Sequence, residues 1–339
     1  MKVCIIGAGA IGGFIGAKLA LAGQAQVSAL ARGATLQALR ERGWRLQQNA
    51  GQGGALLQAP VHAVAEQASA LGPQDLVVIA VKGPALPAVA AGIAPLLAAH
   101  TRVLPAMNGV PWWFCQGVPG FGETALASVD PGGIVAAAIA RERVIGCVVH
   151  IATSSPEPGL VEHKFGQSLI VGDATGGRSE TAQRVADLLA HAGFDMTHSA
   201  DVRQDIWFKL WGNLTMNPVS AITGATLDRL LADPLVRAFC SAAMAEAARV
   251  GERIGCPIAQ TPEDRHAITG KLGAFKTSML QDVEAGRAIE LDGIVGVVHE
   301  IAGRVGVVTP NIDALLGLAR LFGRVHGLYP EAPGAAGAG

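Results

Sequence analysis

The strongest constraint on the fold lies in the first sixteen residues, MKVCIIGAGAIGGFIG. Lys2–Ile6 has the apolar character of a buried strand, and it leads directly into a G-x-G-x-x-G motif. Helical spacing over 11–22 and a second strand-like run at 25–30 complete a β-α-β unit around that motif. A glycine motif is weak evidence by itself, but this position between a strand and a helix is typical of dinucleotide-binding domains.

Each glycine of the motif has a physical role at this position. The first permits a tight turn, the second allows the backbone to approach a pyrophosphate, and the third lets the helix close onto the strand. The helix N-terminus then offers free N–H groups and the positive end of its dipole to the anion. A purely structural turn is the alternative. The residues expected to hold the pyrophosphate are Gly7, Ala8, Gly9, Ala10, Ile11 and Gly12.

The second strand of this unit ends without an acidic residue. Sites that prefer NAD place Asp or Glu about 20 residues after the loop, where the carboxylate binds the ribose 2′-hydroxyl. In this chain the first acidic residue is Glu41, and the stretch 27–32 ends in Arg32. Because a guanidinium group suits the 2′-phosphate of NADP, we expect NADPH as the cofactor and Arg32 as a ligand of its phosphate. An ordinary surface charge at Arg32 is the alternative.

Strand-like runs recur to about residue 199, among them 75–81, 102–106 and 168–172. Their continuous apolar character favours a parallel sheet covered on both faces. Beyond residue 200 helical spacing replaces them. We therefore predict three parts: an α/β Rossmann-type dinucleotide-binding domain over 1–200, an all-α domain over 201–328, and a disordered tail rich in Pro, Gly and Ala over 329–339.

Composition excludes several classes of protein. The 26 basic and 27 acidic residues leave no electrostatic footprint for nucleic acid or an anionic membrane. No apolar run of about 18 residues suggests a membrane span and no signal-peptide pattern opens the chain, so we expect a cytoplasmic protein. The five cysteines are scattered without a C-x-x-C pair, and no histidine spacing fits a metal site.

A polar stripe marks the second half of the chain. Lys209, Asn213 and Asn217 recur every four residues, which places them within an arc of about 80° on a helix. Their apolar neighbours normally face a core, so we expect the lysine to be partly desolvated, which lowers its pKa. Such a lysine suits carbonyl reduction, because the arriving hydride leaves an alkoxide that must be protonated. A solvated helix face with two incidental amides is the alternative.

Taken in order, these motifs resemble those of the ketopantoate reductase (2-dehydropantoate 2-reductase) family, over about residues 1–320. The resemblance implies an N-terminal Rossmann domain, a helical C-terminal domain and an active site in the cleft between them. It also implies NADPH-dependent reduction of 2-dehydropantoate to (R)-pantoate, a step of pantothenate and coenzyme A synthesis. Besides the glycine loop with Arg32 and the K-x-x-x-N-x-x-x-N-P stripe, the motifs that carry it are Ala80-Val81-Lys82, Asn108-Gly109, Ser278-Met279-Leu280-Gln281-Asp282 and Glu290-Leu291-Asp292.

The resemblance also implies roles for individual residues. Lys209 is the implied general acid. Glu290 is implied to lie where the nicotinamide ribose, the substrate and Lys209 converge, and a carboxylate there keeps the lysine charged and oriented. The remaining implied contacts are Asn213, Asn217 and Ser278 with the substrate, and Lys82, Asn108 and Ala152 with the cofactor.

Two stretches depart from the family pattern. The sequence Val110-Pro111-Trp112-Trp113-Phe114 follows Asn108-Gly109, where many relatives carry small residues. These bulky side chains either plug or reline the cleft, or they belong to a core or an interface. Thr223-Gly224-Ala225-Thr226-Leu227 stands where many relatives carry a further asparagine.

We therefore predict an NADP-dependent oxidoreductase that reduces a small-molecule 2-oxo acid, with 2-dehydropantoate as the first candidate. One alternative is a related reductase of a different 2-oxo acid or β-hydroxyacid. Another is a non-catalytic NADP(H)-binding sensor, against which the lysine, serine and glutamate set argues. We expect no nucleic acid, membrane or metal as partner, and leave a homodimer open.

Overall fold

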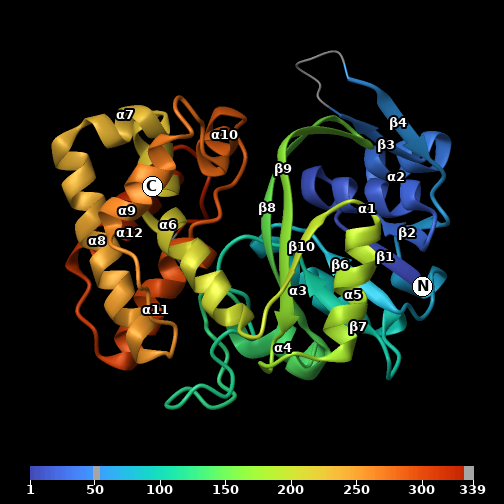
Figure 1. The fold of residues 1–339 in the computed structure, drawn as a ribbon, viewed down its shortest axis with the longest axis horizontal. Helices are drawn as coiled ribbons and strands as arrows, with labels where there is room; N and C mark the ends of the chain where they lie inside the picture. The colour runs from blue at the N-terminus through green and yellow to red at the C-terminus, as the bar shows by residue number, and fades with distance from the viewer. Residues whose placement is uncertain (49–53, 332–339) are drawn as a thin grey trace, which may run out of the picture. The chain divides into compact units, whose positions relative to one another are not determined.

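The computed structural model describes residues 1–48 and 54–331, and the chain divides into two compact units (Figure 1). The first unit comprises Met1–Phe114 and Gly132–Ile206, and the second comprises Cys115–Pro131 and the chain from Trp207 onward. The division falls within one long helix, α6 (Val202–Thr223), whereas the sequence placed it at residue 200. Residues 332–339 of the predicted tail lie outside the described residues.

The first unit is built on a five-stranded sheet in the order β5-β2-β1-β6-β7. All pairings within it are parallel, which confirms the parallel sheet expected from the apolar runs. Ile5 at the centre pairs with Ala29 on one side and Val78 on the other, and all three are fully buried. The strands are β1 (Lys2–Ile6), β2 (Gln26–Leu30), β5 (Val64–Ala65), β6 (Leu76–Ile79) and β7 (Arg102–Pro105).

A second, mixed sheet lies in the same unit. Its centre is the antiparallel pair β8 (Ile145–Glu157) and β9 (Leu160–Asp173), the two long green arrows of Figure 1. The strands predicted near 168–172 and 195–199 exist as part of β9 and as β10 (Asp195–His198), but they belong to this second sheet. β3 (Trp44–Gln47) pairs parallel with β9, and β4 (Leu56–Ala59) pairs antiparallel with β3.

Helix α1 (Ala10–Ala22) packs against both sheets of the first unit. A Cβ atom at Gly13 would lie 2.6 Å from Val161 of β9, and one at Gly16 would lie 2.6 Å from the Trp44 ring of β3. Glycine weakens a helix interior by about 1 kcal/mol relative to alanine. Its repeated use here is explained by the space that the second sheet occupies.

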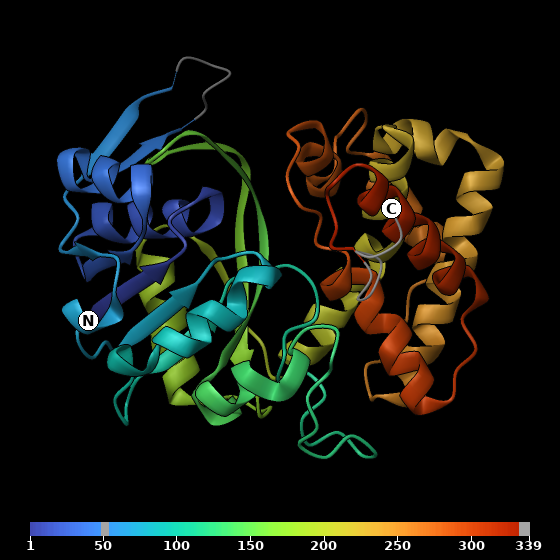
Figure 2. The ribbon, with the colours of Figure 1, turned by 180° about the vertical axis from the view of Figure 1, so that it is seen from behind.

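The described residues of the first unit also form four further α-helices and several 3₁₀ turns. The side chain of Ser179 caps α5 by accepting a hydrogen bond from the backbone N–H of Ala182 at 3.0 Å. Figures 1 and 2 show α5 and α3 on opposite sides of the unit. The α-helices are α2 (Gly33–Arg42), α3 (Leu86–Gly92), α4 (Ile134–Ala138) and α5 (Glu180–His191), and the 3₁₀ turns are η2 (Ala68–Ala70), η3 (Gly83–Ala85), η4 (Ala94–Leu96), η5 (Pro131–Gly133) and η6 (Arg141–Arg143).

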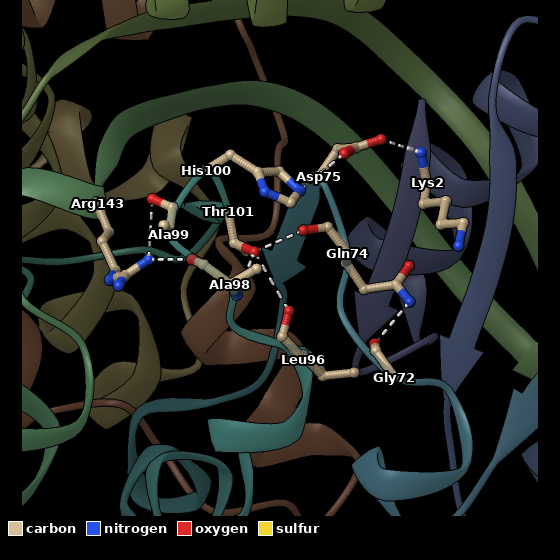
Figure 3. Close-up of polar contacts among 10 residues, drawn as sticks. All are labelled: Lys2, Gly72, Gln74, Asp75, Leu96, Ala98, Ala99, His100, Thr101 and Arg143. Carbon is tan, nitrogen blue, oxygen red and sulfur yellow. Dashed lines mark hydrogen bonds and ion pairs between the residues drawn. The ribbon is translucent and has the colours of Figure 1, made fainter.

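A polar cluster closes the amino ends of β1, β6 and β7 (Figure 3). The buried hydroxyl of Thr101 donates to the carbonyl of Gln74 at 2.6 Å and accepts from the N–H of Ala98 at 2.8 Å. Asp75 accepts a hydrogen bond from the backbone N–H of Lys2 at 2.7 Å and pairs with His100 at 3.1 Å. These contacts satisfy the backbone groups at one edge of the sheet and leave the carboxyl edge for other partners.

Trp112 and Trp113 are core residues of the first unit, with exposed fractions of 1% and 0%. The indole N–H of Trp112 donates to the carbonyl of Ile139 at 3.4 Å. A Cβ atom at Gly146 would lie 3.0 Å from the Trp113 ring and 2.8 Å from Val202. These neighbours belong to the same unit and favour the core interpretation over a lining of the cleft.

The second unit is helical, and one of its helices, α12, begins on a buried carboxylate. The carboxylate of Glu246, which is 3% exposed, accepts hydrogen bonds from the N–H groups of Asn311 and Ile312 and thereby caps α12. No helix formed by residues 1–48 and 54–331 has the length and apolar character of a membrane span. Besides α6, the elements are α7 (Leu227–Ala232), α8 (Pro234–Arg253), α9 (Pro262–Gly270), α10 (Ser278–Glu284), the π-helix η7 (Asp292–Gly296), α11 (Val297–Val305) and α12 (Pro310–Val325).

The segment Cys115–Pro131 is fixed to α11 by one carboxylate. Glu300 accepts hydrogen bonds from the N–H of Ala127 at 2.9 Å, the N–H of Ser128 at 2.8 Å and the Ser128 hydroxyl at 2.7 Å. Burial acts to raise the pKa of Glu300, but these hydrogen bonds and Arg304 outweigh it and hold the pKa below its ordinary value of 4.5. The charged carboxylate therefore stabilises this attachment.

Glu300→Gln should lower the free energy of unfolding at neutral pH by about 1–3 kcal/mol, because one acceptor oxygen and the negative charge are lost. Since the pKa in the folded chain lies below that in the unfolded chain, the contribution of Glu300 is full above the ordinary carboxyl pKa and is lost as the pH falls through the folded value. Denaturant unfolding of both proteins at several pH values measures this, and the difference should shrink toward acid. Glu252→Gln, at an exposed position of α8, is the control. A difference that stays constant with pH would contradict the explanation.

Candidate functional site

The glycine loop has the backbone that a phosphate cradle needs. Gly7 adopts a φ of +88°, and a Cβ atom there would lie 2.7 Å from the carbonyl oxygen of Ala80. A Cβ atom at Gly12 would collide with the carbonyl of Gly7 and lie 2.9 Å from the Ala80 side chain. These two glycines are therefore required by the close packing of the loop, α1 and the end of β6.

Gly9 differs from its two partners because it faces open space. It is exposed, and around an added Cβ atom no described residue beyond its chain neighbours comes within 4 Å. Gly9 is the N-cap residue of α1, and within the described part of the chain no side chain caps this helix end and no acidic residue lies in its first turn. The first-turn N–H groups and the helix dipole remain suited to an anion.

Four strands end in register beside this loop. Ile6, the last residue of β1, pairs with Leu30 of β2 and Ile79 of β6, and Ile79 pairs with Pro105 of β7. The carboxyl edge of a parallel sheet is where doubly wound folds bind their ligands. The residues that follow these strand ends are therefore placed around one site.

Three of the predicted cofactor residues lie at this edge. Arg32 lies two residues after the last residue of β2, has extended backbone with φ of −132°, and is exposed at the start of α2. Lys82 follows β6, is half-buried and begins the η3 turn. Asn108 follows β7 and is exposed beside Gly109, whose φ is +85°. The structure thus brings Arg32, Lys82 and Asn108 to the edge that carries the glycine loop.

Ala152 lies on a different element from these residues. It is on β8, opposite Phe165 of β9, where the register between the two strands shifts. β8 starts beside β7, through a parallel bridge between Val103 and Val144, and continues past the end of β7. Its predicted contact with the cofactor stays a prediction.

Helix α6 carries the predicted polar stripe of the second unit. Lys209 and Asn213 are half-buried, and Asn217 is 6% exposed. Among the described residues, no hydrogen bond joins the side-chain amides of Asn213 and Asn217 to another group. Buried amides without a protein partner favour a ligand over an incidental surface stripe.

The other side of α6 holds the helix in place. The indole N–H of Trp211 donates to the carbonyl of Met244 in α8 at 2.7 Å. The Trp207 indole lies against Gly251 of α8, where a Cβ atom would collide with its nitrogen. Because this anchoring face is buried, the rotation of α6, and with it the direction of the polar stripe, is fixed by packing on α8.

Ser278 and Glu290 stand on separate short elements of the second unit. Ser278 is the exposed first residue of α10, whose preceding Thr277 caps the helix through the N–H of Leu280 at 3.2 Å. Glu290 is half-buried between the buried side chains of Ile289 and Leu291, directly before the π-helix η7. Turns of π-helix are rare and frequently occur at functional sites.

No sequence pattern predicted this π-helix or the hydrogen bond of Tyr329 to it. Tyr329, within the stretch predicted as a tail, donates from its hydroxyl to Asp292 of η7 at 2.6 Å. In the sequence, the one feature that could have indicated this contact is the presence of an aromatic residue, Tyr329, among residues typical of disorder. The Asp282 of the Ser278 motif has a structural role, because it pairs with Arg287 at 2.8 Å.

The cysteines and the possible metal ligands of the described residues do not form a second candidate site. All five cysteines are free and buried, and burial raises the pKa of Cys4 to about 12 and that of Cys240 to about 11. Such thiols stay protonated and unreactive. Within residues 1–48 and 54–331, no three His, Cys, Asp or Glu side chains are grouped so that they could hold a metal ion.

Comparison with known proteins agrees with this arrangement over the whole chain. The family model described as Ketopantoate reductase PanE/ApbA matches residues 3–115, and the one described as Ketopantoate reductase PanE/ApbA C terminal matches residues 201–322. A 2-dehydropantoate 2-reductase of Mesorhizobium japonicum is 44% identical over 330 residues, covering 97% of this chain and 100% of that protein.

Solved structures show the same relationship. A ketopantoate reductase homologue from Ralstonia solanacearum MolK2 has a TM-score of 0.91 and 52% identity, covering 97% of this chain and 99% of that chain. The 2-dehydropantoate 2-reductase from Methylococcus capsulatus has a TM-score of 0.81 and 26% identity, with coverages of 96% and 98%. The chain therefore belongs to the ketopantoate reductase family of NADP-dependent oxidoreductases.

Proposed function

We propose that this protein catalyses the NADPH-dependent reduction of 2-dehydropantoate to (R)-pantoate. The observation that carries the proposal is the identity along the whole chain with a 2-dehydropantoate 2-reductase. The polar stripe of α6 supports it, because a lysine can donate a proton and two side-chain amides can orient the substrate, which are the groups that a 2-oxo acid reductase needs.

The residues of the first unit fit the cofactor. The uncapped N-terminus of α1 and the open space at Gly9 suit the pyrophosphate, and Arg32 at the end of β2 suits the 2′-phosphate. Lys82 and Asn108 follow the neighbouring strands β6 and β7, and we assign them to the cofactor together with the loop and Ala152. When bound, NADPH supplies a hydride to the carbonyl carbon of the substrate.

The residues of the second unit supply the proton and orient the substrate. Lys209 donates a proton to the alkoxide oxygen that forms from the carbonyl, acting as the general acid. Asn213, Asn217 and Ser278 offer neutral donors to the carboxylate and hydroxyl oxygens of the substrate. Glu290 keeps Lys209 protonated by its negative charge and also contacts the cofactor.

Two further predictions concern the setting of the enzyme. We propose a cytoplasmic location, as expected from the sequence. A homodimer stays a prediction from the sequence, and the mass measured by sedimentation equilibrium tests it.

Arg32→Ala should raise the KM for NADPH by about 10–150-fold and leave that for NADH nearly unchanged. A charge-assisted contact of about 1.5–3 kcal/mol is lost with the phosphorylated cofactor alone. Steady-state kinetics with both cofactors measure the difference, and Arg40→Ala, an exposed arginine of α2, is the control for net charge. Equal use of NADPH and NADH by the unmodified enzyme would contradict the role of Arg32.

Lys209→Ala should lower kcat by about 10²–10⁴, the usual contribution of a positioned general acid. NADPH binding, measured by cofactor fluorescence, should stay nearly the same because the glycine loop and Arg32 belong to the other unit. The unmodified enzyme should lose activity at alkaline pH as the lysine deprotonates.

Lys271→Ala, at an exposed position after α9, is the matched control for the loss of one positive charge. A folded Lys209→Ala protein that keeps turnover within a few-fold of the original would assign the stripe a structural role.

A panel of 2-oxo acids of different size, assayed by oxidation of NADPH, should give the highest kcat/KM for 2-dehydropantoate. Trp113→Phe should preserve this ranking while lowering the free energy of unfolding by about 1–3 kcal/mol, because Trp113 is a core residue. A different best substrate would favour a related reductase, and no oxidation with any acid would favour a sensor. A reordered ranking in Trp113→Phe would place that side chain at the substrate.

A further inference from the structure

Tyr329 is the single tyrosine of the chain, and it is attached to the segment that carries Glu290. Its hydroxyl donates to Oδ1 of Asp292 at 2.6 Å, and the side chain is half-buried. Asp292 is the first residue of η7 and follows Glu290 by two positions. The hydrogen bond therefore joins the segment that follows α12 to the start of the π-helix.

Two glycines make room for this contact. A Cβ atom at Gly323 of α12 would lie 2.6 Å from the Cβ of Tyr329, so the tyrosine packs against the helix backbone itself. A Cβ atom at Gly296 would lie 3.2 Å from Oδ1 of Asp292, the oxygen that accepts the hydrogen bond. Glycine is unfavourable in a helix interior. Its presence at both positions is explained by the tyrosine and the carboxylate that fill the space.

A second contact holds the other side of Glu290. The N–H of Ile289 donates to the carbonyl of Leu328 at 3.0 Å, and the N–H groups of Leu328 and Tyr329 donate to the carbonyl of Gly323 at 2.7 and 3.2 Å. Ile289 and Leu328 are buried. Glu290 thus lies between two anchored residues, one held by the backbone of Leu328 and one by the side chain of Tyr329.

The surroundings of Tyr329 keep its hydroxyl protonated, so that it can donate a hydrogen bond. Burial, the hydrogen bond to Asp292 and the negative charge of Asp292 raise the pKa of Tyr329 to about 12, against the opposing effect of Arg320 and Arg324. The guanidinium of Arg324 lies 5.8 Å from the centre of the ring and donates to the carbonyl of Pro330 at 3.1 Å. The hydroxyl therefore stays protonated throughout the pH range of an enzyme assay.

We propose that Tyr329 is a positioning residue for Glu290, acting through Asp292 and the backbone of Ile289. The hydrogen bond fixes the direction in which the chain enters η7, and with it the direction of the Glu290 side chain two residues earlier. This inference rests on the proposed role of Glu290 in turnover. It adds the segment after α12 to the proposed active site, because Leu328 and Tyr329 hold the residues on either side of Glu290.

The first experiment is a double-mutant cycle on the full chain. Tyr329→Phe keeps the ring and removes the hydroxyl, and it should lower kcat by about 3–30-fold with the KM for NADPH unchanged. In a Glu290→Gln background the same substitution should change kcat by less than about twofold, because the group that it positions has been replaced. The control for lost packing is Phe322→Leu, which removes a half-buried ring of α12 that lies tilted against the ring of His326, with 4.3 Å between the ring centres.

The second measurement is independent of activity. Because Tyr329 is the single tyrosine, the absorbance of tyrosinate reports its ionisation directly. Asp292→Asn keeps the acceptor oxygen and removes the charge, so the tyrosinate signal should emerge at lower pH than in the unmodified protein. An unchanged titration would show that the pair does not form in solution and would overturn the proposal.

The outcomes separate this proposal from the proposed function. If Glu290→Gln alone has normal turnover, the assignment of Glu290 fails and the positioning role fails with it. If Glu290→Gln is impaired but the effects of the two substitutions multiply, Tyr329 acts independently of Glu290 and the positioning role alone is overturned. Equal losses of kcat in Phe322→Leu and Tyr329→Phe would assign Tyr329 to stability.

Discussion

The first unit depends on the close approach of α1 to its surroundings. Gly12 lets the helix meet the loop of Gly7, and Gly13 and Gly16 let it meet β9 and β3. These glycines weaken the helix by about 1 kcal/mol each, and close packing between two sheets offsets this. The same packing holds the loop backbone and directs the uncapped helix end toward the carboxyl edge. The proposed phosphate site and the core packing therefore depend on the same close approach of α1, so residues that form the core of this unit also shape the proposed site.

In the second unit, the direction of the polar stripe on α6 is set by the opposite, buried face of that helix. Trp207 and Trp211 fix α6 against α8, which leaves the stripe of Lys209, Asn213 and Asn217 on another side of the helix. The side-chain amides of Asn213 and Asn217, to which no described residue is hydrogen-bonded, weaken a helix considered alone. Such local disagreement between a residue and its surroundings is expected at functional sites, where a ligand provides the missing partners.

Patterns carried by neighbouring residues were predictable, and pairings between distant residues were not. The glycine loop, the parallel strands and the single helix through the polar stripe follow from local periodicity, and the structure contains all three. The second sheet escaped prediction because β8 becomes polar beyond Ala152 and exposed over its last three residues, and because β3 and β9 pair across more than a hundred residues. The environment of Tyr329 escaped because composition averages over a segment, whereas its packing depends on Gly323 and Asp292.

In the helical unit, carboxylates accept hydrogen bonds near both ends of α12. Glu246 caps the start of α12, and Asp292 accepts the hydrogen bond from Tyr329 just beyond the end of the same helix. The contact with Glu246 of α8 and the contact of Tyr329 with Asp292 therefore hold α12 near both of its ends. Because α8 also anchors α6 through Met244, one helix supports both the Lys209 stripe and, through α12, the chain around Glu290. Lys209 and Glu290, the acid and the carboxylate of the proposed mechanism, lie far apart in sequence. Both are supported by contacts with α8 within the second unit.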